Sequence, residues 1–218
     1  MDLARVYAYR FRDIDPQSRS EVWRVIAQYV HRRLGEPRRV LDPAAGLGEF
    51  IAHSPSPDRW AVDIVDHGLS AIPGITTRIA PILEADLPDD SFDAVFVSNL
   101  LEHLASPTEI GQFLSRMHRL LRVGGVIGIM GPNFKYCQTE YFDCADHVLA
   151  LTHVSVAEHL YGAGFEVQSI TPRFLPYSFR SILPASRRLT SAYLDMPILW
   201  RFFGKQFLVI GRRPPRGA

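Results

Sequence analysis

Two acidic residues each end a short apolar segment that is typical of a buried strand. Asp42 follows "VL" at 40–41, and Asp63 ends "RWAVD" at 59–63. After Asp42 the chain turns through "PAAGLG" (43–48), whose glycines let the backbone approach a ligand closely. Ligands of open α/β sheets bind at the carboxyl ends of the strands. Asp63 can accept hydrogen bonds there from both hydroxyls of a ribose, so the pattern predicts a nucleotide or nucleoside site.

The glycine spacing argues against a dinucleotide. A G-x-G-x-x-G loop needs a third glycine where this chain has Ile51, and a helix whose N-terminus faces the pyrophosphate. The prolines of "HSPSPD" (53–58) end any helix after Phe50 within about a turn. A nucleoside without phosphate needs no such helix and fits better.

A second set of residues able to do chemistry lies in the segment 131–155. It combines amide, carboxylate, imidazole and phenol groups: Asn133, Tyr136, Tyr141, Asp143, Asp146, His147 and His153. We hypothesise that His147 is a general base oriented by Asp143 or Asp146, with His153 as second choice. The alternative is that Asp146 and His147 cap a local turn. Asp143, Asp146 and His147 could also ligate a divalent cation, but no second cluster of ligands supports this, and we expect no metal.

The elements that position these residues alternate along the chain. Short apolar runs, typical of strands buried on both faces, predict seven strands at 40–43, 59–64, 75–80, 93–98, 126–130, 165–170 and 207–211. Helix N-termini are indicated by Asp15-Pro16, by "SPTE" (106–109) and by "SVAE" (155–158). The early connections are near the minimum length of a parallel crossover. The pattern predicts a doubly wound α/β sheet with short early crossovers.

Five motifs in this order carry a family resemblance: "VLDPAAGLGEF", "AVDI", "LPDDSFDAVFVSNLLEHL", "LLRVGGVIGIMGPN" and "AGFEV". Together they resemble the class I S-adenosylmethionine-dependent methyltransferases, in the type 11-like branch, over roughly residues 38–170. The resemblance implies a Rossmann-like seven-stranded sheet, mostly parallel with an antiparallel last strand. It also implies methyl transfer from S-adenosyl-L-methionine.

The same resemblance implies which residues bind the cofactor. They are Asp42, Ala44, Gly46, Gly48, Asp63, Ile64, Asp86, Ser98 and Asn99. The loop after the first strand would line the methionine part, with Asp42 orienting the loop or the amino group. Asp63 would hold the ribose, Ile64 would pack on adenine, and Ser98 and Asn99 would lie beside the sulfonium and the carboxylate.

Two positions depart from the family pattern, and one further residue matches it. Ala44 stands where the family has the first loop glycine. Alanine is tolerated there if the φ of Ala44 is ordinary. The family has an acid that contacts the adenine amino group, and Leu83 stands at that position here. We predict that the nearby Asp86 makes this contact instead, with Glu84 as the other choice. His103, in "LEHL", would face the methyl-transfer site or fix the start of the next helix.

Charge is distributed unevenly between the body of the chain and its C-terminal part. Residues 1–171 carry 15 Lys/Arg and 22 Asp/Glu, whereas residues 172–218 carry nine and one. Basic and aromatic residues alternate in an insert at 172–205, before the last strand. It could be a lid for an anionic acceptor such as a nucleotide-linked sugar, a peripheral membrane contact that meets a lipid-linked acceptor, or a packed subdomain or dimer contact. Nucleic acid is not an expected partner.

We therefore expect a small-molecule methyltransferase, with an N-terminal helical cap at 1–37 and a methyltransferase domain at 38–218. The acceptor we predict is a hydroxyl of a sugar or glycan precursor. The alternatives are a lipid, quinone or natural product as acceptor, or a non-catalytic scaffold. No leader pattern or apolar run of 18 residues is present, so we expect a cytoplasmic protein. Cys137 and Cys144 are then expected to be reduced.

Overall fold

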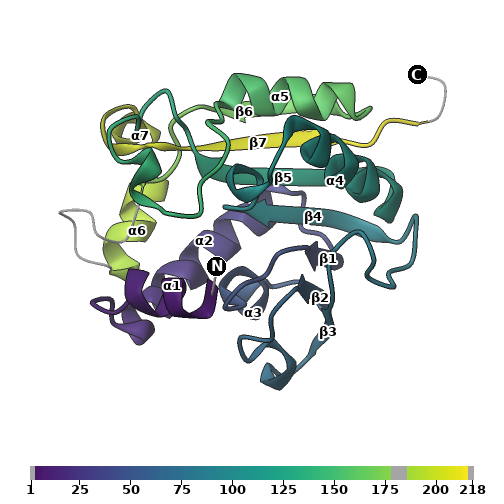
Figure 1. Cartoon of the computed structure of the whole chain (residues 1–218), viewed down its shortest axis with the longest axis horizontal. Helices are drawn as coiled ribbons and strands as arrows, with labels where there is room; N and C mark the ends of the chain where they lie inside the picture. Colours follow the sequence, from purple (N-terminus) through teal and green to yellow (C-terminus); the bar gives the residue numbers. More distant parts are fainter. Residues whose placement is uncertain (1–2, 178–185, 216–218) are drawn as a thin grey trace.

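The computed structural model describes residues 3–177 and 186–215. Residues 1–2, 178–185 and 216–218 lie outside that description, and with them Phe179 and Arg180 of the insert. The described chain forms one seven-stranded sheet of order β3-β2-β1-β4-β5-β7-β6 (Figure 1). Its strands are β1 (Arg39–Asp42), β2 (Asp58–Asp63), β3 (Ile75–Ile79), β4 (Phe92–Ser98), β5 (Leu121–Pro132), β6 (Glu166–Thr171) and β7 (Gln206–Arg212).

The sheet confirms the predicted Rossmann-like doubly wound fold and all seven predicted strands. Neighbouring strands from β3 to β5 pair in parallel, whereas β7 runs antiparallel to both β5 and β6. The largest difference in a strand boundary is at β5, which starts at Leu121 rather than near Val126. Leu121 pairs with Phe92, and a register shift before Ala94 absorbs the extra residues.

The helices are α1 (Leu3–Arg10), α2 (Pro16–Arg33), α3 (Glu49–His53), α4 (Pro107–Leu120), α5 (His153–Gly162), α6 (Arg187–Leu194) and α7 (Pro197–Phe203), with short 3-10 turns η1 (Leu69–Ala71), η2 (Leu101–His103) and η3 (Tyr141–Asp143). The predicted short crossovers are confirmed: α3 has five residues, and only η1 lies between β2 and β3. Asp15 caps α2 as predicted, accepting a hydrogen bond from the Ser18 amide at 2.7 Å.

The start of α5 was predicted about one turn too late. Its N-cap is Thr152, whose hydroxyl accepts from the Ser155 amide, while the Ser155 hydroxyl accepts from the Thr152 amide. Ser155 therefore plays the part that a glutamate takes in the usual capping box. The glutamate of "SVAE", Glu158, lies beyond it in the helix and is exposed.

Two apolar layers cover the sheet, one on each face. One joins α2, α3, α6 and α7 to inward-facing residues of the strands, and the other joins α4 and α5 to the opposite face (Figure 1). Phe174, Tyr193 and Trp200 of the insert are buried in the first layer beside Val22 and Ile26 of α2. Both α2 and the described parts of the insert thus contribute to the main core, and a domain boundary after residue 37 stays a prediction. Among the described residues, no helix has the length and apolarity needed to cross a bilayer.

Candidate active site

The loop between β1 and α3 is held in place by one backbone hydrogen bond to β2 and another within the loop itself. The Ala45 amide donates to the Val62 carbonyl at 3.0 Å, and the Gly48 amide donates to the Ala45 carbonyl at 2.8 Å. Gly46 and Gly48 have φ of 53° and 74°, in the left-handed region. In the described chain the non-glycine residues with positive φ are Glu36, Asp90 and Asn99, so Ala44 meets the condition set for it.

The two glycines face different surroundings. A Cβ on Gly46 would have no heavy atom within 4 Å, so the loop is open on that side. A Cβ on Gly48 would lie 2.7 Å from the Ile72 side chain and 2.8 Å from that of Leu69. Gly48 is therefore needed for the close packing of η1 against the loop, a requirement separate from any ligand.

Asp63 lies where the loop meets the end of β2. One carboxylate oxygen accepts from the Gly46 amide at 2.7 Å, and the other accepts from the Val65 amide at 3.0 Å. Each oxygen retains a lone pair for a further donor. The adjacent Ile64 is 59% exposed, which leaves an apolar surface next to the carboxylate.

Asp42 is buried at the end of β1. Burial raises the pKa of its carboxyl to about 8, and the negative charges of Asp63 and Glu49 act in the same direction. The Ala44 amide, 3.4 Å from the Asp42 carboxylate, opposes the rise. Asp42 thus faces the inside of the loop and helps to fix its shape.

Of the remaining predicted cofactor residues, Ser98 and Asn99 lie at the carboxyl end of β4, and Asp86 lies in the segment between β3 and β4. Ser98 ends β4, and Asn99 follows it with φ of 50°, its amide bonded to the Met130 carbonyl at 2.9 Å. Such a conformation in a non-glycine residue is costly and tends to mark functional sites. Asp86 and Leu83 are both exposed in the segment after β3.

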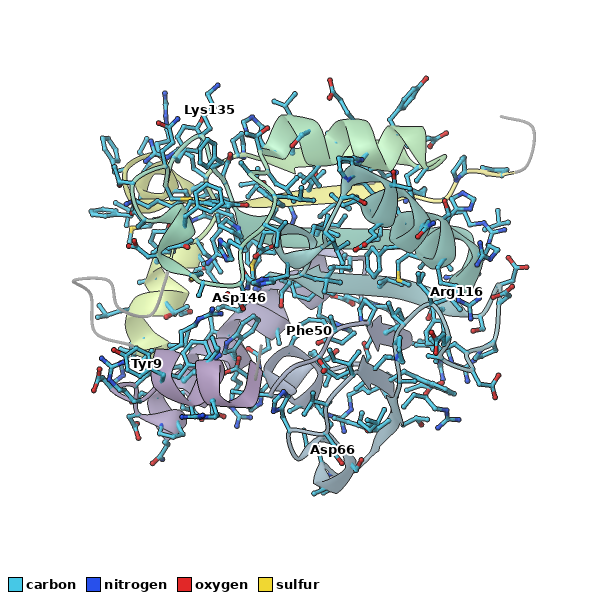
Figure 2. The ribbon with its side chains drawn as sticks, in the orientation of Figure 1. Tyr9, Phe50, Asp66, Arg116, Lys135 and Asp146 are labelled. Carbon is cyan, nitrogen blue, oxygen red and sulfur yellow. The ribbon has the colours of Figure 1, made fainter. Side chains whose placement is uncertain are left out.

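The segment 133–152, here called the acceptor loop, folds back onto η2 at the same edge of the sheet. The Val148 and Leu149 amides donate to the Glu102 carbonyl at 2.8 and 3.1 Å. The Tyr141 hydroxyl donates to the Leu149 carbonyl and accepts from the Leu151 amide. In Figure 2, Asp146 of this loop lies toward Tyr9 of α1 and Lys135, away from Arg116 near the other end of the strands.

This folding brings Glu102, His103, Asp146 and His147 together, a set we call the histidine cluster. The Asp146 carbonyl lies 2.9 Å from Nδ1 of His103, and the Asp146 carboxylate lies 3.6 Å from the same atom. The carboxylate also pairs with Arg10 of α1. The His103 and His147 rings meet edge to face with centroids 4.9 Å apart.

Burial dominates the electrostatics of the histidine cluster. It raises the pKa of Glu102 to about 7, with the neighbouring His103 working against the rise. Burial and the charge of His103 lower the pKa of His147 to about 4. Oε1 of Glu102 and Nδ1 of His147 are both buried without a hydrogen-bond partner among the described residues.

Of the residues in the general-base hypothesis, the structure brings only Asp146 and His147 together. Asp146 is oriented toward His103 and Arg10 rather than pairing with His147. Asp143 is exposed, and within the described chain its side chain has no hydrogen-bond or ion-pair partner. His153 lies at the start of α5, where its Nδ1 accepts from the Asn133 amide at 2.9 Å.

Sequence reasoning missed Glu102 and Arg10 as parts of this site. A carboxylate inside the run "NLLEHL" could have been noticed, since a charge among leucines indicates burial with a special purpose. The position of Arg10 depends on how α1 packs, and no local signal gives that. Cys137 is buried and Cys144 is half-buried, and neither forms a disulfide in the described chain.

Comparison with known proteins agrees with this geometry. Residues 35–129 match the family model described as a methyltransferase domain. An S-adenosylmethionine-dependent methyltransferase from Archaeoglobus fulgidus has a similar fold (TM-score 0.68, 18% identity, 97% of this chain and 100% of that one). A putative methyltransferase of Haloferax volcanii, solved with the Trm112 methyltransferase activator, is equally similar (0.68, 17%, 97% and 96%).

A third structure contains ligands. It is a Burkholderia thailandensis 1,6-didemethyltoxoflavin-N1-methyltransferase with bound 1,6-didemethyltoxoflavin and S-adenosylhomocysteine (TM-score 0.60, 20% identity, 98% of this chain and 90% of that one). No curated protein matches the chain.

The fold, the domain match and the open loop beside Asp63 define a class I methyltransferase that uses S-adenosyl-L-methionine. Within that class, residues 35–129 match the domain model of the type 11-like branch. The residues present fit the cofactor, because the open side of Gly46 lies beside an Asp63 carboxylate with lone pairs to spare. When bound, the cofactor supplies an activated methyl group.

Proposed function

We propose that the methyl acceptor is a hydroxyl group of a small molecule, most specifically a sugar or glycan precursor. The observation that carries the proposal is the histidine cluster, whose first member, Glu102, lies in η2 three residues after Asn99. It holds lone pairs on Glu102 and His147 that no described protein group uses. A neutral hydroxyl must lose its proton as the methyl group is transferred, whereas an amine need only be deprotonated beforehand. An unused lone pair in the histidine cluster is suited to accept the proton of a hydroxyl during methyl transfer.

On this proposal the cofactor-binding residues keep the roles that the resemblance implies. Asp63 would accept from the ribose hydroxyls, Ile64 would cover adenine, and Gly46 would let the backbone approach the methionine part. Ser98 and Asn99 would lie beside the reacting centre, and Asp86 would reach the adenine amino group. The chain's main contribution to rate would be alignment of the acceptor and exclusion of water.

His147 would take the acceptor proton, and the Asp146 contacts would fix the neighbouring His103. The Asn133 bond to His153 occupies the lone pair that a base would need, which supports His147 over His153. Asp143, which is exposed, would serve only if the acceptor loop moved when the acceptor binds.

A second candidate is a lipid-linked acceptor at an anionic membrane surface. Near α7 a surface hollow of about 620 Å³ is lined by Tyr136, Arg173, Ile198, Arg201 and Phe202. Ile198 and Phe202 are 59% and 69% exposed, and Phe203 is 51% exposed. Apolar and basic side chains on one exposed helix are the combination that favours an anionic bilayer. The Burkholderia neighbour, by contrast, favours a heteroaromatic natural product as the alternative.

The test is S-adenosylhomocysteine release from the whole protein with panels of hydroxyl acceptors (nucleotide-linked and lipid-linked sugars), amines and heteroaromatic compounds. We expect turnover with a hydroxyl acceptor. His147→Ala should lower kcat by ~10²–10⁴-fold, the usual contribution of a general base. His153→Ala, which removes the histidine at the start of α5, should have a much smaller effect. Calorimetry with S-adenosylmethionine shows whether cofactor binding survives in both variants.

Turnover with amines only, or unchanged turnover in His147→Ala with intact cofactor binding, would overturn the proposal.

A further inference from the structure

We infer that Glu102, His103 and His147 form a binding site for a divalent transition-metal ion. The site's part in the reaction rests on the proposed function, since the ion would act on the acceptor hydroxyl in place of free His147. The ability to bind the ion does not depend on the acceptor. One ligand atom from each of the three residues lies within 4.8 Å of the others.

The ring of His103 is oriented as a metal ligand would be. A carbonyl oxygen can only accept, so Nδ1, 2.9 Å from the Asp146 carbonyl, carries the proton. That leaves a lone pair on Nε2, which faces Oε1 of Glu102 at 4.0 Å. Metal-binding histidines characteristically donate their other ring N–H to a carbonyl or carboxylate in this way.

Glu102 provides the strongest single argument for the site. Its side chain is 3% exposed, and Oε1 has no hydrogen-bond partner among the described residues. Its backbone is fixed by the Val148 and Leu149 amides, so the carboxylate cannot easily swing out to water. A buried carboxylate without a partner is costly, and a cation at this point would satisfy it.

His147 completes a three-ligand set. Its Nδ1 is buried and unpartnered, and its ring is packed edge to face between His103 and Tyr141, at 4.9 and 4.8 Å. Arg10 of α1 is a cationic neighbour of the cluster, and its charge is offset by the ion pair with Asp146. A bound metal ion would therefore not lie beside an uncompensated charge on Arg10.

The ligand types indicate the kind of ion. Two imidazoles and one carboxylate suit Zn²⁺, Co²⁺, Mn²⁺ or Fe²⁺, whereas Mg²⁺ prefers oxygen ligands only. Three protein ligands also leave coordination positions open, as in catalytic rather than structural sites. A second set of nearby atoms, from Cys144, Asp146 and His147, is a weaker choice. There the Asp146 carboxylate is already paired with Arg10, and Sγ of Cys144 lies 3.6 Å from the Tyr177 hydroxyl.

The experiment measures ion binding by the whole, chelator-treated protein. Zn²⁺ is titrated by calorimetry, and Co²⁺ by its visible absorption, which is intense at low coordination number. We expect one ion per chain, with Mg²⁺ unable to compete. Glu102→Gln and His147→Ala should each weaken binding at least ~100-fold. Loss of a residue that only supports a ligand costs up to about this much, and loss of a direct ligand should cost at least as much. His153→Ala is the matched control and should bind like the wild type.

Circular dichroism establishes that each variant is folded. Absence of binding to the wild type, or binding that survives in folded Glu102→Gln, would overturn the inference. Loss of binding in Cys144→Ser but not in Glu102→Gln would overturn it in favour of the other ligand set.

The two proposals fail separately. If no ion binds but His147→Ala still abolishes methylation of a hydroxyl, the metal inference falls and the proposed function stands. If the ion binds as expected but only amines are methylated, the metal site is supported and the proposed function falls.

Discussion

At the scale of single residues, the glycines of the β1–α3 loop have different tasks, although the resemblance gives them the same one. Gly46 is open where its Cβ would lie, so Gly46→Ala places a methyl group in the space we assign to the cofactor. We expect a stability loss of about 1–2 kcal/mol from the left-handed φ and a clear loss of S-adenosylhomocysteine affinity. Calorimetry and urea unfolding measure the two effects.

Gly48→Ala is the matched comparison. It adds the same φ penalty and a clash with Ile72 and Leu69, and overpacking typically costs a further ~1–3 kcal/mol. The expected damage is therefore mainly to stability. A Gly48→Ala protein that is stable but does not bind the cofactor would instead support direct cofactor contact by Gly48.

Asp42 makes stability depend on pH in an unusual direction for an acid. Burial raises its pKa from 3.8 to about 8, so the folded state holds this proton more tightly than the unfolded chain. Its contribution to stability is fully present below about pH 4 and is lost as the pH rises through 8. Asp42→Asn keeps an oxygen for the Ala44 amide but cannot ionise.

Between about pH 5 and pH 8, we expect the free energy of unfolding of the wild type to fall relative to that of Asp42→Asn. The relative fall is on the order of 1–3 kcal/mol, the cost of a poorly solvated buried polar group. Urea unfolding at several pH values measures it. A difference between the two proteins that does not change with pH would mean that Asp42 is ionised throughout.

At the scale of elements, local signals predicted what local interactions decide. Asp15 and Pro16 start α2 because the Asp15 side chain caps the helix and the proline ring fixes a helical φ at its first residue. Both effects depend only on adjacent residues. The prolines after Phe50 end α3 through an equally local effect. The start of α5 was misplaced because two hydroxyls, Thr152 and Ser155, form a cap that a glutamate usually completes.

The histidine cluster was beyond such signals. Glu102 and His147 are 45 positions apart, and they meet only because the acceptor loop bonds back to η2. The ordered family motifs lie on strands and their ends, so they predicted the sheet and the loop after β1, while the cofactor residues assigned from them stay a prediction. The acceptor side depends on long-range loop packing, which the residue pattern does not specify.

The described parts of the insert at 172–205 are packed into the main core. Trp200 of α7 is 8% exposed, donates to the Tyr193 carbonyl at 2.9 Å, and meets Tyr29 and Phe174 edge to face. Trp200→Ala should cost about 3–5 kcal/mol, as for other buried aromatic residues. Phe202→Ala, on the same helix but 69% exposed, should stay within about 0.5 kcal/mol of the wild type. Equal effects in urea unfolding would contradict the packed arrangement.

At the scale of the whole molecule, charge and exposed apolar surface coincide. Residues 172–218 carry a net charge of +8 while the rest carries −7. Some of the positive charge is paired internally, as in Arg187 with Glu21 and Lys205 with Glu140. Arg201 is exposed on α7 among Ile198, Phe202 and Phe203. The helix α7 lies at the end of the molecule toward which β4 points (Figure 1). This arrangement would orient the active site toward an anionic bilayer.

Vesicle flotation tests that orientation without removing buried residues. We expect the protein to float with vesicles of phosphatidylcholine and phosphatidylglycerol, less so at high salt, and not with phosphatidylcholine alone. Replacing Ile198 and Phe202 by serine should weaken binding at least ~10-fold, because each side chain contributes about 1.5–3 kcal/mol when fully buried in an apolar phase. Tyr161→Ser is the control, since Tyr161 is 77% exposed but lies on α5. If the serine double variant floats as well as the control, α7 does not contact the membrane, and its apolar face then serves the acceptor or another copy of the chain.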